Sequence, residues 1–574
     1  MRQSAAEKSY FLYTKRADFE RIAGTFGIDP VTARVLRNRD LVTDEEMDLF
    51  LNGGLEALYD ERLLPNIEEA AERLRVAVHA GKRIRVVGDY DIDGVCATCI
   101  LVTGLERIGA RVDHRVPDRV KDGYGINLRI VEEAAAAGID TILTCDNGIA
   151  AIEELRAAKE LGLQVIVTDH HDVRMGEDGA ELLPPADVIV SAKLQESRYP
   201  TKEICGAATA WKLIRVLYRL CGVPEDEWLR LLEFAAIATV GDVMPLRGEN
   251  RIIVKEGLLR INRGAENLGL RALIAACGLT GRQIGSYHIG FVLGPCINAG
   301  GRLKTAELAL RLFFAKTEQE AEAAAQQLKV LNDERKYMTE QGTAEAVELV
   351  EQQYASDPVL AVYVPGLHES LAGIVAGRLK EQFWHPAFVF TDAEDGGLKG
   401  SGRSIEAYHM FNGLCACAQL LTRFGGHPMA AGLSLPKENL EELRRQLNAN
   451  AKLSPEDFRK KVWIDAAMPL SYVTEKLTEE LERLAPFGTG NEKPVFAEKQ
   501  VRVTDLRVLG RDKNVLRMTL REPSGFAMAG IRFCDAEAEA DALRKREFVT
   551  VLYEPQINEF NGRKTLQAVV QDYF

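Results

Sequence analysis

Between residues 84 and 191, short apolar runs alternate with longer segments of helical composition. The runs are IRVVG, TILTC, QVIVT and DVIVS, and Ala/Leu-rich stretches such as EEAAAAG and AIEELRAAKELG lie between them. A strand that is apolar on both faces is buried on both faces, and strands separated by helices of this length pair in parallel. The pattern therefore predicts an α/β domain whose parallel sheet is covered by helices on both sides.

The rest of the chain predicts several further domains. At 574 residues the chain is too long for a single hydrophobic core. We expect a mostly helical region after the sheet, and then a long helix that leads into a smaller α/β unit. The predicted boundaries are 1–50 for an N-terminal helical segment, 51–320 for the first α/β domain, 321–355 for the connecting helix, 356–452 for the second α/β unit and 460–574 for a strand-rich domain.

The strand-rich domain has the pattern of a small β-barrel of the oligonucleotide-binding (OB) type. In NVLRMTLRE, Leu516, Met518 and Leu520 alternate with other residues, which is the period of a half-buried strand. Asn561-Gly562 predicts a hairpin turn, and about five short strands suit an OB-type barrel. Seven basic and two acidic residues between Lys499 and Arg521 give a local net charge of +5. A basic strand face of this kind would track a nucleic-acid backbone, and a solvated edge strand is the alternative.

The composition narrows the class of protein. A net charge of −13 argues against indiscriminate binding to polyanions but does not exclude a local basic groove. No apolar stretch approaches the ~20 residues of a membrane span, and the N-terminus lacks the apolar stretch of a secretory signal. We therefore expect a soluble, cytoplasmic protein. Cys96 and Cys99 form a C-x-x-C, but a zinc site would need two further ligands.

Acidic and imidazole side chains follow four apolar runs of the chain. Because the carboxyl ends of parallel strands meet at one edge of a sheet, where ligands bind, we expect these side chains to converge. They are Asp89, Asp91 and Asp93 in GDYDIDG, Asp146 in CDNGI, His170 and His171 in TDHH, and Asp242 after AAIATV, a run that we expect to be a strand like the others.

Such convergence requires a compensating positive charge, because each buried unpaired carboxylate costs several kcal/mol. Carboxylates combined with imidazole favour Mn²⁺ or Mg²⁺ over a thiolate-type zinc site. Two ions bridged by a shared carboxylate would suit a hydrolase that clamps phosphate oxygens and activates a water. Taken singly, the motifs have ordinary interpretations: an acidic turn, a reverse turn and a structural histidine pair. A calcium loop is disfavoured, because the glycine and distal glutamate of that motif are absent at the required spacing.

GDYDIDG, CDNGI, TDHH and GDVMPL resemble the successive motifs of the DHH phosphoesterase superfamily. The resemblance implies that His171 contacts substrate phosphate or assists proton transfer. It also implies two Mn²⁺ or Mg²⁺ ions as cofactors, with Asp89, Asp91, Asp93, Asp146, His170 and Asp242 as their ligands.

Other stretches are similar to the RecJ branch of that superfamily and to its companion DHHA1 domain. They are VPDRVKDGYGIN, GPCINAGGRLKTAELAL, LNDERKYMTEQ, GSGRS, FGGHPMAAG and LAPFGTGNEKPVF. The small residues and the guanidinium of GSGRS suit close approach to a phosphate and a bidentate grip on it. The implied substrate contacts are Arg119, Arg302, His368, Ser401, Gly402, Arg403, Ser404, His427 and Arg517, the last with Arg502, Lys513 and Arg521 nearby. The chain departs from the family pattern at Cys296, Leu367 and Asn514.

The resemblance implies an exonuclease that degrades single-stranded DNA from the 5′ end to mononucleotides, in DNA repair and recombination. A single-strand-binding protein and a RecQ-type helicase are the implied protein partners. Two alternatives stay open: a DHH enzyme that acts on short oligonucleotides, pyrophosphate or cyclic dinucleotides, and a non-catalytic scaffold that binds nucleic acid. The barrel and the chain length speak against the first alternative, and the complete set of acidic and imidazole residues speaks against the second.

Overall fold

The computed structural model describes residues 7–119, 122–560 and 562–574, which form two compact units. The first unit consists of Tyr59–Asp242 and Gly257–Lys460 together with residues 7–9. The second consists of Tyr10–Leu58, Val243–Glu256 and Lys461–Phe574. Each unit is therefore assembled from segments that are far apart in the sequence. In the described ranges we find no helix with the length and apolar character that crossing a membrane requires.

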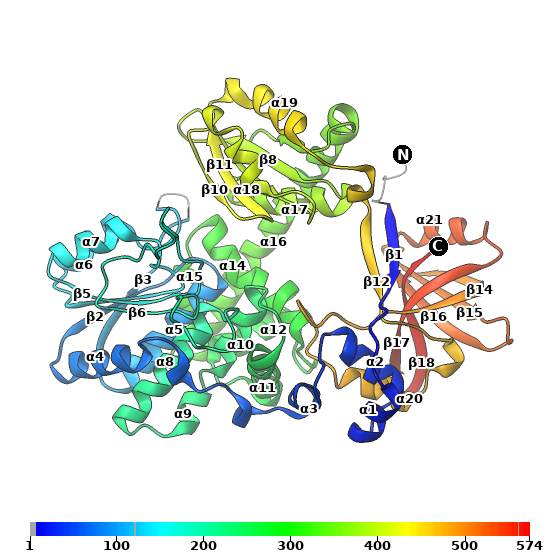
Figure 1. Ribbon diagram of the computed structural model, residues 1–574, viewed down its shortest axis with the longest axis horizontal. Helices are drawn as coiled ribbons and strands as arrows, with labels where there is room; N and C mark the ends of the chain where they lie inside the picture. The colour runs from blue at the N-terminus through cyan, green and yellow to red at the C-terminus, as the bar shows by residue number, and fades with distance from the viewer. Residues whose placement is uncertain (1–6, 120–121, 561) are drawn as a thin grey trace. The chain divides into compact units, whose positions relative to one another are not determined.

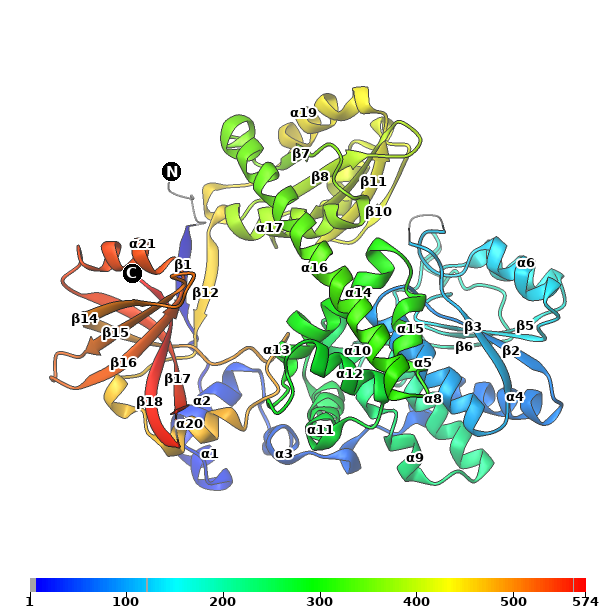
Figure 2. The ribbon, with the colours of Figure 1, turned by 180° about the vertical axis from the view of Figure 1, so that it is seen from behind.

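The predicted parallel sheet is present in the first unit (Figures 1 and 2). Its strands follow the order β3-β2-β4-β5-β6, and every neighbouring pair is parallel. Four of the strands coincide with the four predicted apolar runs. The bounds are Arg83–Val87 for β2, Arg111–Arg115 for β3, Thr141–Cys145 for β4, Gln164–Thr168 for β5 and Val188–Val190 for β6.

The edge strand β3 does not follow from the sequence pattern. Its sequence, RVDHR, contains one apolar residue, and none of its five residues is fully buried. A strand at the edge of a sheet pairs on one side only and tolerates polar side chains, so it lacks the apolar run that marks the central strands.

Helices cover both faces of this sheet, as expected. On one face, Ile130 of α6 and Leu155 of α7 belong to the same apolar cluster as Val87 and Val165 of the sheet. On the other face, α8 packs against both α4 and α5 (Figure 1). The bounds are Ile67–His79 for α4, Ile92–Arg107 for α5, Leu128–Ala136 for α6, Ile152–Glu160 for α7 and Gly206–Cys221 for α8.

The apolar run AAIATV is a helix, so the expectation of a strand at this position was wrong. It lies within α10 (Leu232–Gly241), whose residues up to Thr239 are all buried. A helix that is buried on every side has no polar face, so its periodicity does not distinguish it from a buried strand. Its alanines favour the helix. Asp242 therefore follows the C-terminal end of a helix.

The predicted connecting helix is α16 (Glu318–Leu349), which ends in a π-helical turn, Val350–Tyr354. Four helices of the first unit pack against it. They are α12 (Leu268–Ala276), α14 (Gly294–Leu303), α15 (Glu307–Phe313) and α17 (Ala372–Phe383).

A second five-stranded sheet follows α16, with the order β10-β11-β9-β8-β7. Only the β7–β8 pair is parallel. Helix α17 covers one face, where Val375 clusters with Val362 and Val389, and α19 covers the other, where Leu443 clusters with Phe388. The bounds are Leu360–Tyr363 for β7, Ala387–Asp392 for β8, Leu398–Arg403 for β9, Arg423–Gly426 for β10, Ala430–Leu435 for β11, Met410–Cys415 for α18 and Leu440–Asn450 for α19.

The second unit contains the predicted barrel, a sheet in the order β13-β14-β15-β16-β18-β17 that an additional β14–β17 pairing closes into a ring. Leu516, Met518 and Leu520 are buried, as their alternation predicts. Asn561 lies outside the described residues, but the strands that flank it pair antiparallel, with Phe560 opposite Arg563. The bounds are Ala466–Ala467 for β13, Phe496–Leu509 for β14, Val515–Arg521 for β15, Ala527–Phe533 for β16, Val549–Phe560 for β17, Arg563–Tyr573 for β18, Glu475–Glu482 for α20 and Ala536–Leu543 for α21.

The N-terminal segment is not purely helical and does not stand apart from the barrel. It contains a strand, β1 (Lys8–Leu12), which pairs with β12 (Lys460–Ile464). Ile22 and Leu36 belong to the apolar cluster that fills the barrel. The helices of this segment are α1 (Phe19–Phe26), α2 (Pro30–Asn38) and α3 (Asp44–Asn52).

Candidate metal centre

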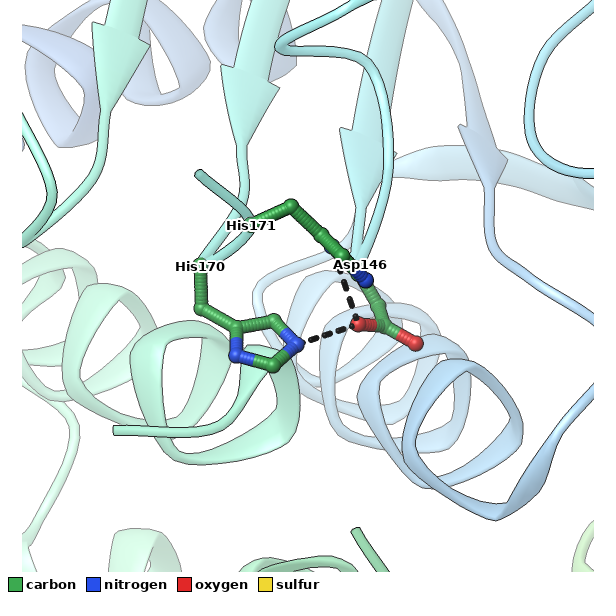
Figure 3. Close-up of side chains that lie close together, drawn as sticks. All are labelled: Asp146, His170 and His171. Carbon is green, nitrogen blue, oxygen red and sulfur yellow. Dashed lines mark ion pairs between the residues drawn. The ribbon is translucent and has the colours of Figure 1, made fainter. Parts of the chain in front are cut away.

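Three neighbouring strands of the parallel sheet end at the same edge, and each is followed by an acidic or imidazole residue. Asp89 follows β2, Asp146 follows β4, and His170 follows β5. Figure 3 shows the Asp146 carboxylate and the His170 ring pointing toward each other, with 3.0 Å between Asp146 Oδ1 and His170 Nε2. The predicted convergence at this edge is therefore observed in the structure.

The loop after β2 turns directly into α5, and this turn positions the predicted ligands Asp89 and Asp91. Asp91 is the N-cap of α5, and its Oδ1 accepts hydrogen bonds from the backbone amides of Asp93 and Gly94 at 3.0 and 3.1 Å. A Cβ on Gly94 would lie 2.5 Å from the backbone nitrogen of Asp89. Glycine at the end of GDYDIDG therefore allows the helix to start against the Asp89 backbone.

Asp93 is held from the opposite side by another helix. Its two carboxylate oxygens accept hydrogen bonds from the amides of Gly206 and Ala207, each at 2.7 Å. These amides lie at the N-terminus of α8, where the helix dipole favours a negative charge. Both carboxylate oxygens are thus fixed in position, and Asp93 Oδ2 lies 3.4 Å from His170 Nε2.

Asp242 reaches the same histidine from the end of α10. Its Oδ2 lies 3.6 Å from His170 Nε2. The next residue, Val243, has a φ of 59°, a left-handed conformation that a β-branched residue rarely adopts. Asp146 is also left-handed, with a φ of 59°. Such backbone strain is typical of functional sites and persists only where the surrounding structure imposes it.

Three atoms in this centre are buried without a hydrogen-bond partner among the described residues: Asp146 Oδ1, His170 Nε2 and Asp242 Oδ2. Buried polar atoms without partners are rare because each costs about 1–3 kcal/mol. All three are acceptors when the aspartates are ionised and the His170 Nε2 is unprotonated, so a cation would satisfy them together.

The ligand atoms form overlapping groups, in each of which all atoms lie within 4.8 Å of one another. One group contains Asp93, His170 and Asp242, and a second contains Asp89, Asp91 and Asp146. Asp146 also groups with His170 and His171. Because Asp146 and His170 recur, the arrangement fits two neighbouring cations that share a ligand, and oxygen-rich donors with an imidazole suit Mn²⁺ or Mg²⁺.

The electrostatics of the centre also favour a cation. Burial, reinforced by neighbouring aspartates, raises the pKa of both Asp89 and Asp146 well above the usual range. Burial and the charges of Asp93 and Asp91 raise the pKa of Asp242 to about 8. These carboxylates cannot all be ionised at neutral pH without compensation, and a bound divalent ion would supply that compensation.

Asp169, the first residue of the DHH motif, positions both histidines and was not among the predicted site residues. Its carboxylate accepts hydrogen bonds from the backbone amides of His170 and Ile149 at 2.7 and 2.9 Å, and it lies 2.8 Å from His171 Nδ1. Burial alone would lower the pKa of His171, but the Asp169 hydrogen bond and charge raise it to about 9. Asp169 therefore favours the protonated form of His171. The sequence shows only an aspartate next to two histidines, and the hydrogen bonds that define its role form on folding.

Tyr124 and Asn147 were not among the predicted site residues either. Their side chains hold the loop before α6 against the metal centre. The Tyr124 hydroxyl donates to the backbone carbonyl of Asp146 at 2.8 Å and lies 3.0 Å from His171 Nδ1. Asn147 Oδ1 accepts a hydrogen bond from the amide of Ile126 at 3.1 Å. Neither contact has a signal in the sequence, because the two segments meet only in the folded sheet.

Three of the predicted substrate contacts, Arg119, Arg302 and Arg403, act on one another electrostatically. Burial, reinforced by the charges of Arg119, Arg335 and Arg403 and opposed by Asp91, lowers the pKa of Arg302 to about 9. Burial and the charge of Arg119 lower the pKa of Arg403. The Arg119 guanidinium lies 4.6 Å from the centroid of the Tyr90 ring, beside the metal-centre aspartates. Guanidinium groups gathered in this way favour an anion.

The GSGRS segment lies on β9 and combines packing with polar contacts. Arg403 Nη1 donates to Ser401 Oγ at 3.3 Å. A Cβ on Gly402 would lie 2.4 Å from Met410 Sδ, so packing against the core explains this glycine. Ser404 is buried, and its hydroxyl donates to the backbone carbonyl of Tyr408 at 2.6 Å. Gly402 and Ser404 thus contribute to packing and hydrogen bonding within the fold, whereas the Ser401 hydroxyl contacts the Arg403 guanidinium.

His368 and His427 lie in different surroundings. His368 Nδ1 lies 2.8 Å from Ser370 Oγ, and Arg302 Nη1 donates to the Ser370 carbonyl at 2.9 Å, so His368 and Arg302 share a neighbour. The side chain of His427 is exposed, and its charge lowers the pKa of Asp172, after the larger effect of Lys193. Asp172 directly follows His171, which places His427 near the same edge of the sheet.

Arg517 belongs to the second unit, on the outer face of the barrel. The β14–β15 register places Arg517 opposite Arg507 and Arg521 opposite Arg502, and all four side chains are exposed. Like charges directly opposite each other destabilise a sheet, so this arginine ladder favours an anionic ligand. Lys513 pairs with Glu537 at 2.8 Å.

Comparisons with known proteins agree with this architecture. Models described as "DHH family, N-terminal domain", "DHHA1 domain" and "RecJ OB domain" match residues 83–239, 356–453 and 464–572. The single-stranded-DNA-specific exonuclease RecJ of Bacillus subtilis is 37% identical over 551 residues, which is 95% of this chain and 68% of that protein. RecJ of Escherichia coli is 31% identical over 95% of this chain and 96% of its own length.

A solved structure of similar architecture is RecJ from Thermus thermophilus in complex with Mn²⁺. The match has a TM-score of 0.84 and 30% identity, and it covers 99% of this chain and 80% of that one. The same protein in complex with Mg²⁺ gives a TM-score of 0.77, with 27% identity and coverage of 99% and 78%. The chain belongs to the RecJ family of single-stranded-DNA-specific exonucleases.

Proposed function

We propose that this chain is a metal-dependent exonuclease that hydrolyses the phosphodiester bonds of single-stranded DNA. The observation that carries the proposal is the convergence of Asp146 Oδ1, His170 Nε2 and Asp242 Oδ2, which are buried and have no hydrogen-bond partner within the described part of the chain. A non-catalytic scaffold has no need of such a strained and uncompensated cluster.

The ligands in this proposal are those that the sequence predicts: Asp89, Asp91, Asp93, Asp146, His170 and Asp242. Their donor set of carboxylates and one imidazole fits Mn²⁺ or Mg²⁺, the ions held by the Thermus relative. When bound, two such ions would supply Lewis-acid stabilisation of phosphate oxygens and lower the pKa of an attacking water.

The other residues of the centre bind and orient the substrate. Asp169 favours the protonated form of His171, which would donate a hydrogen bond to a phosphate oxygen or a proton to the leaving 3′-oxygen. Arg119, Arg302 and Arg403 would neutralise a phosphate group of the strand, with Ser401 as a further donor. Tyr124 and Asp169 keep His171 in position.

The arginine ladder of Arg502, Arg507, Arg517 and Arg521 is proposed to hold the backbone of the single strand on the barrel. Such contacts are electrostatic and carry no sequence preference. An exonuclease that meets strands of any sequence needs contacts of this kind.

The 5′ to 3′ direction, the release of mononucleotides, the role in DNA repair and recombination and the cytoplasmic location are proposed from family membership. The protein partners, a single-strand-binding protein and a RecQ-type helicase, likewise stay predictions.

Digestion of 5′- and 3′-labelled single strands tests the proposal. With Mn²⁺, the wild type should release the 5′ label first as a mononucleotide, and Asp146→Ala should abolish release. Asp140→Asn is a matched control, because Asp140 is an exposed aspartate just before the same strand, where it accepts a hydrogen bond from the Arg83 amide at 2.8 Å. Undiminished activity in Asp146→Ala, or wild-type hydrolysis of dinucleotides only, would refute the proposal.

A further inference from the structure

Two cysteine thiols outside the metal centre are in contact. Cys277 caps the C-terminus of α12, and Cys296 lies in the first turn of α14. Their sulfur atoms are 3.7 Å apart. Both helices pack against α16, which fixes the two thiols relative to each other. Neither residue has a role in the proposed nuclease reaction.

The two thiols differ in accessibility. Cys277 is partly exposed, whereas Cys296 is 1% exposed. Cys296 Sγ accepts a hydrogen bond from Asn332 Nδ2 of α16 at 3.2 Å. An oxidant from solvent therefore meets Cys277 first and finds the second thiol held directly behind it.

The electrostatic surroundings make Cys277 the reactive member of the pair. The hydrogen bond between the two thiols, together with the charges of Lys329 and Lys336 of α16, lowers the pKa of Cys277 to about 7 against the opposing effects of burial and Asp333. The same hydrogen bond, together with burial, raises the pKa of Cys296. A lowered pKa favours the thiolate form of Cys277, and the thiolate is the nucleophile in thiol oxidation.

The other eight cysteines lack this combination of exposure and a thiol neighbour. Burial raises the pKa of Cys96, Cys99, Cys145 and Cys205, all fully buried, so these thiols stay protonated. Cys415 is exposed, but no other thiol contacts it in the described ranges.

We propose that Cys277 and Cys296 form a modification site at which hydrogen peroxide produces a reversible intramolecular disulfide. The Cys277 thiolate attacks one peroxide oxygen, the O–O bond breaks, and the departing hydroxide takes up a proton to form water. Cys277 is then a sulfenic acid. Cys296 sulfur attacks it, the S–O bond breaks, and the hydroxyl leaves as water with the Cys296 proton. Two thiols and one peroxide give one disulfide and two waters, and a dithiol reductant restores the thiols.

The position of the pair ties it to the functional part of the molecule. Arg302 lies on α14, the same helix as Cys296, and Asn332, which donates to Cys296, accepts a hydrogen bond from Arg335 Nε at 3.0 Å. A disulfide would link the end of α12 covalently to the helix that carries Arg302.

Peptide mapping of the full-length wild type after peroxide treatment tests this proposal without any substitution. Of the ten cysteines, two should be lost as free thiols, and one pair of peptides, containing Cys277 and Cys296, should be linked until dithiothreitol is added. Ten free thiols after treatment, or oxidation of Cys415 while Cys277 and Cys296 stay unlinked, would overturn the assignment.

Variants separate the two steps of the reaction. Cys296→Ala should stop at the Cys277 sulfenic acid, which dimedone traps, and Cys277→Ser should leave Cys296 reduced because Cys296 is buried. The matched control Cys415→Ser should form the disulfide as the wild type does. Dimedone labelling of wild-type Cys277 equal to that of Cys296→Ala would contradict a resolving role for Cys296.

Discussion

At the scale of single residues, helix α10 shows two ways of accommodating a buried carboxylate. Asp242, just after its C-terminal end, faces Asp93 and His170 at the proposed cation site. Glu233, near its start, is 1% exposed and belongs to none of the possible cation sites found among the described residues. Its Oε1 accepts a hydrogen bond from the Glu266 amide at 2.6 Å, and its Oε2 lacks a hydrogen-bond partner among the described residues. Burial raises the pKa of Glu233 to about 7.

Glu233 should therefore make the first unit less stable as the pH rises. Its pKa is 4.5 in the unfolded chain and about 7 in the folded protein. Between these values the folded state binds more protons, so the free energy of unfolding falls with rising pH, by about 3 kcal/mol over the range. Glu233→Gln keeps an acceptor for the Glu266 amide and should unfold at higher denaturant concentration than the wild type at pH 8, but not at pH 5. Glu322→Gln, an exposed residue of α16, serves as control and should leave the pH dependence unchanged. Equal pH dependence in Glu233→Gln and the wild type would contradict this account.

At the scale of elements, the start of α5 is built around one close approach. The Asp91 cap, the first helical turn and the Asp89 backbone occupy the same small volume, and Gly94 alone leaves room for them. The ligands of the first motif are thus positioned by the packing of a helix against the loop from β2.

Gly94→Ala should disrupt the metal centre. A Cβ at this position lies 2.5 Å from the Asp89 nitrogen and oxygen, so either the helix or the loop must move. We expect loss of Mn²⁺-dependent nuclease activity by at least about tenfold, since misplaced ligands cost that much or more. The control is Gly24→Ala in α1, where a Cβ meets nothing within 4 Å; this variant should keep its activity and gain about 0.5–1 kcal/mol in stability. Equal activity of the two variants would contradict the packing argument.

The elements also show how far the sequence predicts this fold. The central strands and the residues that follow them were predictable, because strands buried on both faces have continuous apolar runs. β3 and α10 were not, since an edge strand lacks an apolar run and a fully buried helix lacks a polar face. The carboxylates and His170 could be singled out from their places after apolar runs, but the roles of Asp169 and Tyr124 depend on contacts that only folding creates.

At the scale of the whole molecule, the second unit joins the N-terminal helices to the barrel through a buried ion pair. Arg39 Nη1 lies 2.9 Å from Asp465 Oδ1, and their side chains are 5% and 3% exposed. Asp465 also accepts hydrogen bonds from Asn38 Nδ2 at 3.0 Å and from the Val495 amide at 3.1 Å. The Asp465 carboxylate therefore binds two residues, Asn38 and Arg39, that lie more than four hundred positions earlier in the chain.

Asp465→Ala should destabilise the second unit by about 3–5 kcal/mol, because it leaves Arg39 buried and unpaired. Denaturant unfolding measures the change. Glu479→Ala is the control, since Glu479 pairs with Lys564 at 3.6 Å on the exposed surface and should change stability very little. A loss in Asp465→Ala no larger than in the control would show that the pair does not anchor the helices.

The proposed nuclease function depends most on a pair of cations at the edge of the parallel sheet, and Mn²⁺ binding to the full-length protein measures their presence directly. Equilibrium dialysis should find about two Mn²⁺ ions per wild-type chain, magnetically coupled in electron paramagnetic resonance because they share a ligand. Asp146→Ala should lose the coupling and at least one ion, and Asp140→Asn should bind as the wild type does. A wild-type chain that binds no Mn²⁺, or an Asp146→Ala variant that keeps both ions and their coupling, would contradict the account.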